Sequence, residues 1–274
     1  STILDDPLAG STGTQLTTNP WTGDQAYVQY ADSKTIDGIV STFQNSTAYS
    51  EAFHIPSDSV MVYADGVNNY NNILNSWQTN YTGKDLCIML SCNRAVNETE
   101  YNTEYGGSSS ELQLNSNYER IEPDGVPYIV PTQNFINYKW EIIKHHCDNY
   151  NVKMVVLEEP EIWRASGYSD AFKAEWQSYY NEPWQDPASS IANQYKSDQL
   201  KVYLWERFIT SLASRIKQNF PTVKVLVATH STMSYNAIGI IPGIGHYTEL
   251  ENVDGIIGQT WSNTVSVPVP MNGI

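Results

Sequence analysis

Short apolar runs rich in β-branched residues recur along the chain, and each is bounded by polar or turn-forming residues. Runs of this length and composition are typical of buried β-strands. We therefore predict six strands, over residues 26–32, 59–65, 85–92, 153–159, 223–229 and 254–261.

Between these runs the spacing of apolar residues changes to a helical period. Large apolar side chains recur every four residues from Leu200 to Phe220, which predicts a helix with Ser197 as its N-cap and Pro221 just beyond its end. A weaker pattern predicts a second helix over residues 135–147. Alternation of strands and helices indicates a parallel sheet with helical crossovers.

Two long polar stretches, residues 93–133 and 164–197, each follow the carboxyl end of a predicted strand. In a (β/α)8 barrel this end carries the active site, so these stretches are either loops that shape a substrate site or ordinary tolerated insertions. Six strands do not close an eight-stranded barrel. We expect residues 1–274 to be one α/β domain, a TIM barrel lacking its C-terminal units, with an open doubly wound sheet as the alternative.

Charge and composition exclude several classes of partner. The chain contains 15 Lys and Arg and 30 Asp and Glu, which gives a net charge of -15, and it has no basic run. Nucleic acid and anionic membranes are therefore poor partners. No apolar run reaches the roughly 18 residues that span a bilayer. Residues 239–245 lack the third glycine and the preceding strand of a dinucleotide-binding motif, so we expect no cofactor. His145, His146 and Cys147 are adjacent on a predicted helix, where neighbouring side chains point in different directions, so we expect no metal site there. The oligomeric state is left open.

Aromatic residues are abundant, with 8 Trp and 19 Tyr among many Asn, Gln, Ser and Thr. Such a mixture suits a surface that stacks flat rings and hydrogen-bonds hydroxyl groups, although it also fits a fold that is simply rich in Tyr.

Polar residues follow the predicted strands at their carboxyl ends, and parallel strands bring these ends to one edge of a sheet. We therefore expect one site that includes Asp65, Asn93, Arg94, Glu158, Glu159, Glu161, His230, Gln259 and Trp261.

The most informative of these ends is "MVVLEEPEIW", residues 154–163, where a buried strand leads into three carboxylates. Glu158 and Glu159 repel each other, which favours a retained proton on one of them and suits a general acid. Pro160 is expected to hold Glu159 in extended geometry. The alternative is a solvated acidic loop in which Glu161 pairs with Arg164.

The motif "LEEP" resembles the Asn-Glu-Pro that ends strand four in the large clan of retaining glycoside hydrolases with a TIM barrel. That resemblance implies that Glu159 is the acid/base and that Glu158 replaces the Asn. The block "EEPEIWRASGYSDAFKAEWQSYYNEPWQDP", with "THSTMSYN" and "GQTWSNT", is similar to bacterial glycosidases of unassigned substrate, over roughly residues 24–264. A literal Asn181-Glu182-Pro183 follows no apolar strand, and we predict that it is a loop.

These features together predict a glycoside hydrolase that acts on an oligo- or polysaccharide, with Glu159 as general acid/base and Glu158 beside it. The resemblance implies a second catalytic carboxylate on strand seven of the barrel. We expect this sequence to stop before that strand, so we name no nucleophile. We therefore expect the chain alone to hydrolyse no glycoside. The alternatives are a non-catalytic carbohydrate-binding barrel and a metal-dependent carbohydrate-active enzyme with Asp65, Glu158 and His230 as ligands. We expect an extracellular or periplasmic location, with the cytoplasm left open.

Overall fold

The computed structural model describes residues 27–29, 41–44, 59–67, 74–75, 85–95, 97–122, 125–230, 240–241 and 250–259. Its main feature is a seven-stranded sheet in the order β1-β2-β3-β4-β5-β7-β9. These strands are β1 (Tyr27–Gln29), β2 (Ser41–Gln44), β3 (Ser59–Tyr63), β4 (Asp85–Ser91), β5 (Val152–Glu158), β7 (Lys224–His230) and β9 (Gly255–Gln259). A separate pair joins β6 (Ile162–Trp163) and β8 (Ile240–Ile241) in antiparallel orientation.

Every neighbouring pair from β2 to β9 is parallel, and only β1 runs antiparallel to its neighbour. The carboxyl ends of six strands therefore lie along one edge of the sheet. The hydrogen-bonded order of the described strands is linear from β1 to β9, so the fold is α/β with a mostly parallel sheet. The closed barrel stays a prediction.

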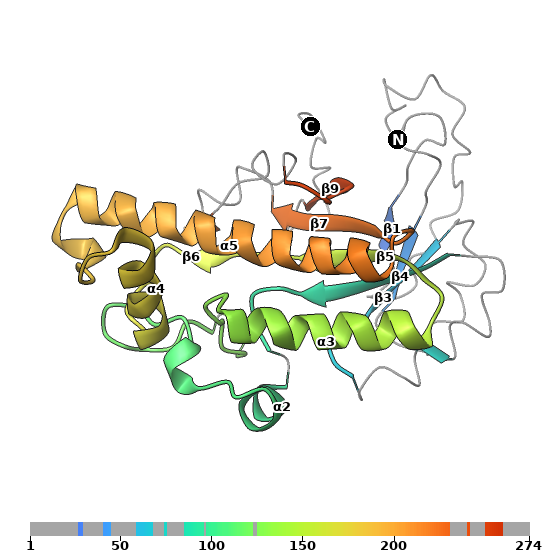
Figure 1. Ribbon diagram of the computed structural model, residues 1–274, viewed down its shortest axis with the longest axis horizontal. Helices are drawn as coiled ribbons and strands as arrows, with labels where there is room; N and C mark the ends of the chain where they lie inside the picture. Colours follow the sequence, from blue (N-terminus) through green and yellow to red (C-terminus); the bar gives the residue numbers. More distant parts are fainter. Residues whose placement is uncertain are drawn as a thin grey trace, which may run out of the picture.

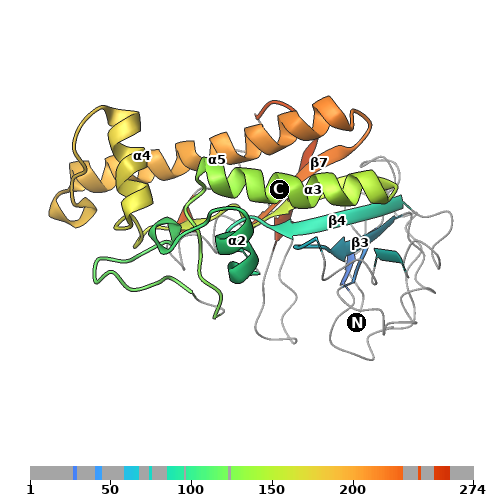
Figure 2. The same ribbon diagram turned by 60° about the horizontal axis from the view of Figure 1, so that its bottom comes forward.

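Two long helices cover one face of this sheet. The described helices are α2 (Glu98–Glu104), the 3-10 turn η2 (Ser109–Glu111), α3 (Gln133–Asn149), α4 (Asp170–Tyr180), the 3-10 turn η3 (Pro187–Ser189) and α5 (Ile191–Asn219). Helices α3 and α5 lie side by side over the strands (Figure 1 and Figure 2). Phe135 of α3 stacks on Phe208 of α5, with 5.6 Å between ring centroids. No helix in the described part of the chain is both long enough and apolar enough to cross a membrane.

The two faces of the sheet carry different side chains because successive residues of a strand point to opposite faces. Ile88, Val155 and Val225 belong to the large apolar core, which also contains the buried side chains of α3 and α5. Met89 and Val156 belong to a smaller cluster on the opposite face. Ser91 and Glu158 lie two residues further along β4 and β5, so they continue that second face to the carboxyl edge.

All six predicted strands are confirmed, although residues 26 and 30–32 of the first and residues 260 and 261 of the last lie outside the described residues. Strands β2, β6 and β8 were missed. The sequence of β2, "STFQ", contains one large apolar residue, and β6 and β8 are two residues each, so none of them carries a recognisable period.

The two predicted helices are also confirmed, but the predicted N-cap of α5 is wrong. Helix α5 begins at Ile191, and the side chain of Ser190 accepts a hydrogen bond from the backbone N–H of Asn193 at 3.1 Å. Ser197 is buried inside the helix. The first two turns of α5 are mostly polar, so the apolar period begins later than the helix does. The helix ends at Asn219, two residues before Pro221.

The polar stretches 93–133 and 164–197 are not simply loops, because α2, α4 and the first turns of α5 lie within them. Asn97 caps α2 and Ser169 caps α4 through hydrogen bonds from backbone N–H groups. The loop predicted at Asn181-Glu182-Pro183 is confirmed: Asn181 ends α4 in the left-handed conformation, and Glu182 binds Lys196 at 2.6 Å.

Candidate active site at the carboxyl edge of the sheet

The strand register brings several of the expected site residues to neighbouring positions. Ser91 of β4 is aligned with Glu158 of β5, and Glu158 is aligned with Ala228 of β7. His230 of β7 is aligned with Gln259 of β9. The residues that end four adjacent parallel strands therefore lie along a single edge, as the sequence predicted.

Glu159 directly follows β5 and has an unusual backbone conformation. Its φ is +49°, in the left-handed region, and its backbone N–H donates to the carbonyl oxygen of Ala228 at 2.7 Å. The expectation that Pro160 holds Glu159 in extended geometry is therefore wrong. The hydrogen bond to β7 turns the chain out of the strand, and this tertiary contact outweighs the local preference before proline. A non-glycine residue in this region costs about 1–3 kcal/mol and is often found at functional sites.

Arg94 lies next to the carboxylate of Glu159. Its Nη2 is 3.9 Å from Oε2 of Glu159, and both side chains are largely buried. The Nε of Arg94 donates to the hydroxyl of Ser91 at 3.0 Å, and the guanidinium lies 5.6 Å from the ring centroid of Tyr128. The guanidinium of Arg94 is thus positioned by Ser91 and Tyr128, and it also lies next to the carboxylate of Glu159, the expected acid.

Tyr63, the last residue of β3, is a site residue that the sequence analysis missed. Burial raises the pKa of Tyr63, the carboxylates of Asp65 and Glu158 raise it further, and Ser91 and Arg94 act in the opposite direction. The phenol therefore keeps its proton near neutrality and can act as a hydrogen-bond donor. The only sequence signal is its position at the end of the run "SVMVY".

Asp65 follows β3 and is 1% exposed. Its Oδ1 accepts from the Nζ of Lys139, which is on α3, at 2.5 Å. Burial raises the pKa of Asp65, and the attraction of Lys139 opposes this effect. The pair links the carboxyl edge of the sheet to the helix layer. Lys139 was not predicted, because nothing in the sequence connects two residues 74 positions apart.

Asn93 and Glu161 are also buried. The side chain of Gln113, which was not predicted as a site residue, joins the segments that contain Ile129 and Glu161. Asn93 accepts from the hydroxyl of Ser91 at 3.1 Å. The side-chain amide of Gln113 donates to the carbonyl oxygens of Ile129, at 3.1 Å, and of Glu161, at 3.3 Å. Its Oε1 also accepts from the backbone N–H of Trp163 at 3.0 Å.

The alternative interpretation of Glu161 as part of a solvated acidic loop is wrong. Glu161 is 1% exposed, and Arg164 pairs with Asp198 at 3.3 Å. Two of the eight tryptophans contribute to the fold. Trp176 is fully buried in the core, and Trp184 donates from its ring nitrogen to the carbonyl oxygen of Gly167 at 3.1 Å.

The rest of the expected site is only partly covered by the structure. His230 and Gln259 are the last residues of β7 and β9, but their side chains lie outside the described residues, as does Trp261. Within the ranges that the structure describes, no group of three or more His, Cys, Asp or Glu side chains could hold a metal ion.

No protein-family model and no curated protein matches the chain. Among solved structures, it is similar to an α-L-fucosidase isoenzyme 2 from Paenibacillus thiaminolyticus, with 12% identity and a TM-score of 0.47 over 65% of this chain and 27% of that one. It is also similar to a GH36 α-galactosidase from Geobacillus stearothermophilus, with 10% identity and a TM-score of 0.39 over 66% of this chain. An α-galactosidase from Lactobacillus brevis gives 6% identity and a TM-score of 0.40 over the same share. The matched region is 24% of each galactosidase chain, so this chain spans about a quarter of the length of the structures it matches.

Proposed function

We propose that this protein is a glycoside hydrolase that acts on an oligo- or polysaccharide, with Glu159 as general acid/base. The observation that carries the proposal is the setting of Glu159. A largely buried carboxylate follows β5, an inner strand of the mostly parallel sheet, in a strained backbone conformation, 3.9 Å from a guanidinium. The resemblance of "LEEP" to the acid/base motif of the retaining clan supports the same residue.

The charges around Glu159 suit a group that gives up a proton and takes it back. Nη2 of Arg94 lies 3.9 Å from Oε2 of Glu159, where it can pair with the carboxylate that remains once the proton has been given up. A general acid/base is protonated and ionised in turn within one reaction cycle, and a cation at this distance is available to the ionised form.

The neighbouring polar groups are proposed to hold the sugar. The phenol of Tyr63, which keeps its proton, can donate to a substrate hydroxyl. Glu158 stands where the family motif has Asn, and we assign it to a substrate hydroxyl as well. Arg94, His230, Gln259 and Trp261 complete the proposed binding residues, whereas Asn93, Asp65 and Glu161 are buried and are assigned to support the site.

The test is the Glu159→Gln variant of the complete protein, assayed on oligosaccharides that the wild-type protein hydrolyses. Gln keeps the shape and the hydrogen bonding but cannot donate the acidic proton, so turnover should fall about 10²- to 10⁴-fold while substrate binding changes little. The matched control is Glu182→Gln, which makes the same change in the literal Asn-Glu-Pro, where the carboxylate pairs with Lys196 on the surface. This control should keep wild-type turnover.

Full activity of Glu159→Gln, or equal losses in both variants, would contradict the assignment of the acid. A wild-type protein that binds the saccharides and hydrolyses none of them would instead identify a non-catalytic carbohydrate-binding protein.

A further inference from the structure

A groove of about 520 Å³ lies between α4, α5, the start of α3 and the segment that precedes η2. It involves none of the residues assigned to the proposed active site. Its wall on α4 is formed by Ala171, Ala174 and Ser178, which are spaced three and four residues apart and so occupy one side of the helix. Small side chains at these positions leave the hollow open.

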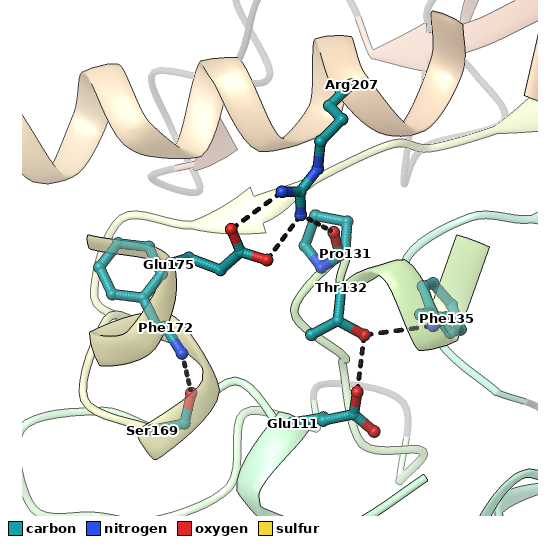
Figure 3. A network of polar contacts seen from close by, with 8 residues as sticks. All are labelled: Glu111, Pro131, Thr132, Phe135, Ser169, Phe172, Glu175 and Arg207. Carbon is teal, nitrogen blue, oxygen red and sulfur yellow. Dashed lines mark hydrogen bonds and ion pairs between the residues drawn. The ribbon is translucent and has the colours of Figure 1, made fainter. Parts of the chain in front are cut away.

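The charged groups at the base of the groove are fixed by contacts with one another (Figure 3). Arg207 reaches from α5 to Glu175 of α4 and makes two hydrogen bonds to its carboxylate, at 2.9 and 2.7 Å. Arg207 also donates to the carbonyl oxygen of Pro131 at 3.0 Å. This bidentate pair is held before any ligand arrives, which reduces the entropy lost on binding.

The acidic residue on the opposite side of the groove is fixed in the same way. Glu111 accepts from the hydroxyl of Thr132 at 2.6 Å and from the phenol of Tyr101 at 2.8 Å. The lining also carries the hydroxyls of Ser108, Ser110 and Ser178. Hydroxyls both donate and accept hydrogen bonds, as does the side-chain amide of Asn134, so the groove offers donors and acceptors beside two carboxylates and one guanidinium.

Exposed aromatic rings adjoin the groove. Tyr203 lies one turn before Arg207 on α5, is 36% exposed, and has the guanidinium of Arg207 at 5.9 Å from its ring centroid. Tyr179, next to Ser178, is 45% exposed, and its ring centroid is 4.6 Å from that of Tyr203. A tyrosine ring can pack against the C–H face of a sugar while acceptor groups bind its hydroxyls.

We propose that this groove, together with Tyr179 and Tyr203, is a second saccharide-binding site that takes a neutral sugar unit. The hydroxyls and the amide of the lining, together with the carboxylates, match the hydroxyl groups of a neutral sugar, which both donate and accept hydrogen bonds. The two carboxylates and the net charge of -15 oppose an anionic sugar. The site goes beyond the proposed hydrolase activity and needs none of its residues, so either proposal can fail without the other.

The test is affinity electrophoresis of the complete protein in native gels containing galactomannan, xyloglucan or a mixed-linkage β-glucan, with polygalacturonate as the anionic comparison. Two variants disrupt the groove: Ala174→Trp fills it from an exposed position on α4, and Tyr203→Ala removes the aromatic surface. Each has a matched control outside the lining, Gln177→Trp on α4 and Tyr195→Ala on α5, both at exposed positions.

We expect at least one neutral polysaccharide to retard the wild-type protein. Ala174→Trp and Tyr203→Ala should weaken the apparent Kd about threefold to tenfold, a range that corresponds to the loss of one aromatic contact, while both controls stay at the wild-type value. Glu159→Gln should keep the groove-dependent retardation, which separates this site from catalysis. The proposal is overturned if no neutral polysaccharide retards the protein, if only polygalacturonate does, or if the groove variants behave as their controls.

Discussion

Glu159 differs from the two asparagines that have positive φ in the described part of the chain. The non-glycine residues with this conformation are Tyr118, Glu159, Asn181 and Asn252. Asn tolerates the left-handed region better than most residues, and Asn181 serves there as the C-cap of α4. Glu159 has no such local reason, and its conformation follows from the hydrogen bond to Ala228 across the sheet. The sequence could predict the position of this carboxylate but not its backbone geometry.

The strain at Glu159 can be measured by comparing two substitutions at that position. Glu159→Ala keeps a Cβ atom and therefore the strain, whereas Glu159→Gly removes it. Both variants lose the carboxylate. Because Gly also gains entropy in the unfolded chain, the net difference should be modest, and we expect the Gly variant to be more stable by about 1 kcal/mol. Urea-induced unfolding of the two variants tests this. An Ala variant as stable as the Gly variant would show that the conformation is not strained.

At the scale of elements, α3 is joined to the segment after β3 by two polar contacts. One is the ion pair between Lys139 and Asp65, and the other is the hydrogen bond that Nε2 of His146 makes to the carbonyl oxygen of Gly66, at 2.9 Å. Lys139 and His146 lie seven residues apart, two turns along one side of the helix. The apolar pattern predicted α3, but it could not identify Asp65 and Gly66 as the partners of Lys139 and His146.

His146 should make the protein sensitive to acid. Burial lowers the pKa of His146 to about 4, and the nearby His145 contributes in the same direction. The unfolded chain binds a proton at His146 as the pH falls through about 6.5, whereas the folded protein does not until about 4. The free energy of unfolding should therefore decrease as the pH falls across this window, by roughly 3 kcal/mol from this residue.

The measurement is urea-induced unfolding at pH 7 and at pH 4, for the wild-type protein and for His146→Gln. Gln can donate to Gly66 in a similar position but does not titrate, so the variant should lose less stability than the wild-type protein between the two pH values. Equal losses in both proteins would show that His146 does not cause the acid sensitivity.

At the scale of the whole molecule, the sequence predicts the elements and the edge of the sheet better than it predicts the site. A continuous apolar run identifies a strand such as β5, and a helical period with several repeats identifies a helix such as α5. Contacts between distant segments leave no such period. The pair of Lys139 with Asp65 joins residues 74 positions apart, and the amide of Gln113 reaches the carbonyl of Glu161 across 48 positions. These contacts position the strand ends, and they became visible only with the fold.

The central claim is that Glu159 donates a proton to the departing glycosidic oxygen. The most direct test is how the rate loss caused by Glu159→Gln, in the complete protein, depends on the leaving group of the substrate. The measurement compares the rate of glycosidic bond cleavage for a natural glycoside, whose leaving group needs protonation, with that for a dinitrophenyl glycoside of the same sugar, which needs little. We predict a loss of about 10²- to 10⁴-fold for the natural glycoside and a far smaller loss for the activated one. Equal losses on both substrates would contradict the claim, because damage to folding or to sugar binding does not depend on the leaving group.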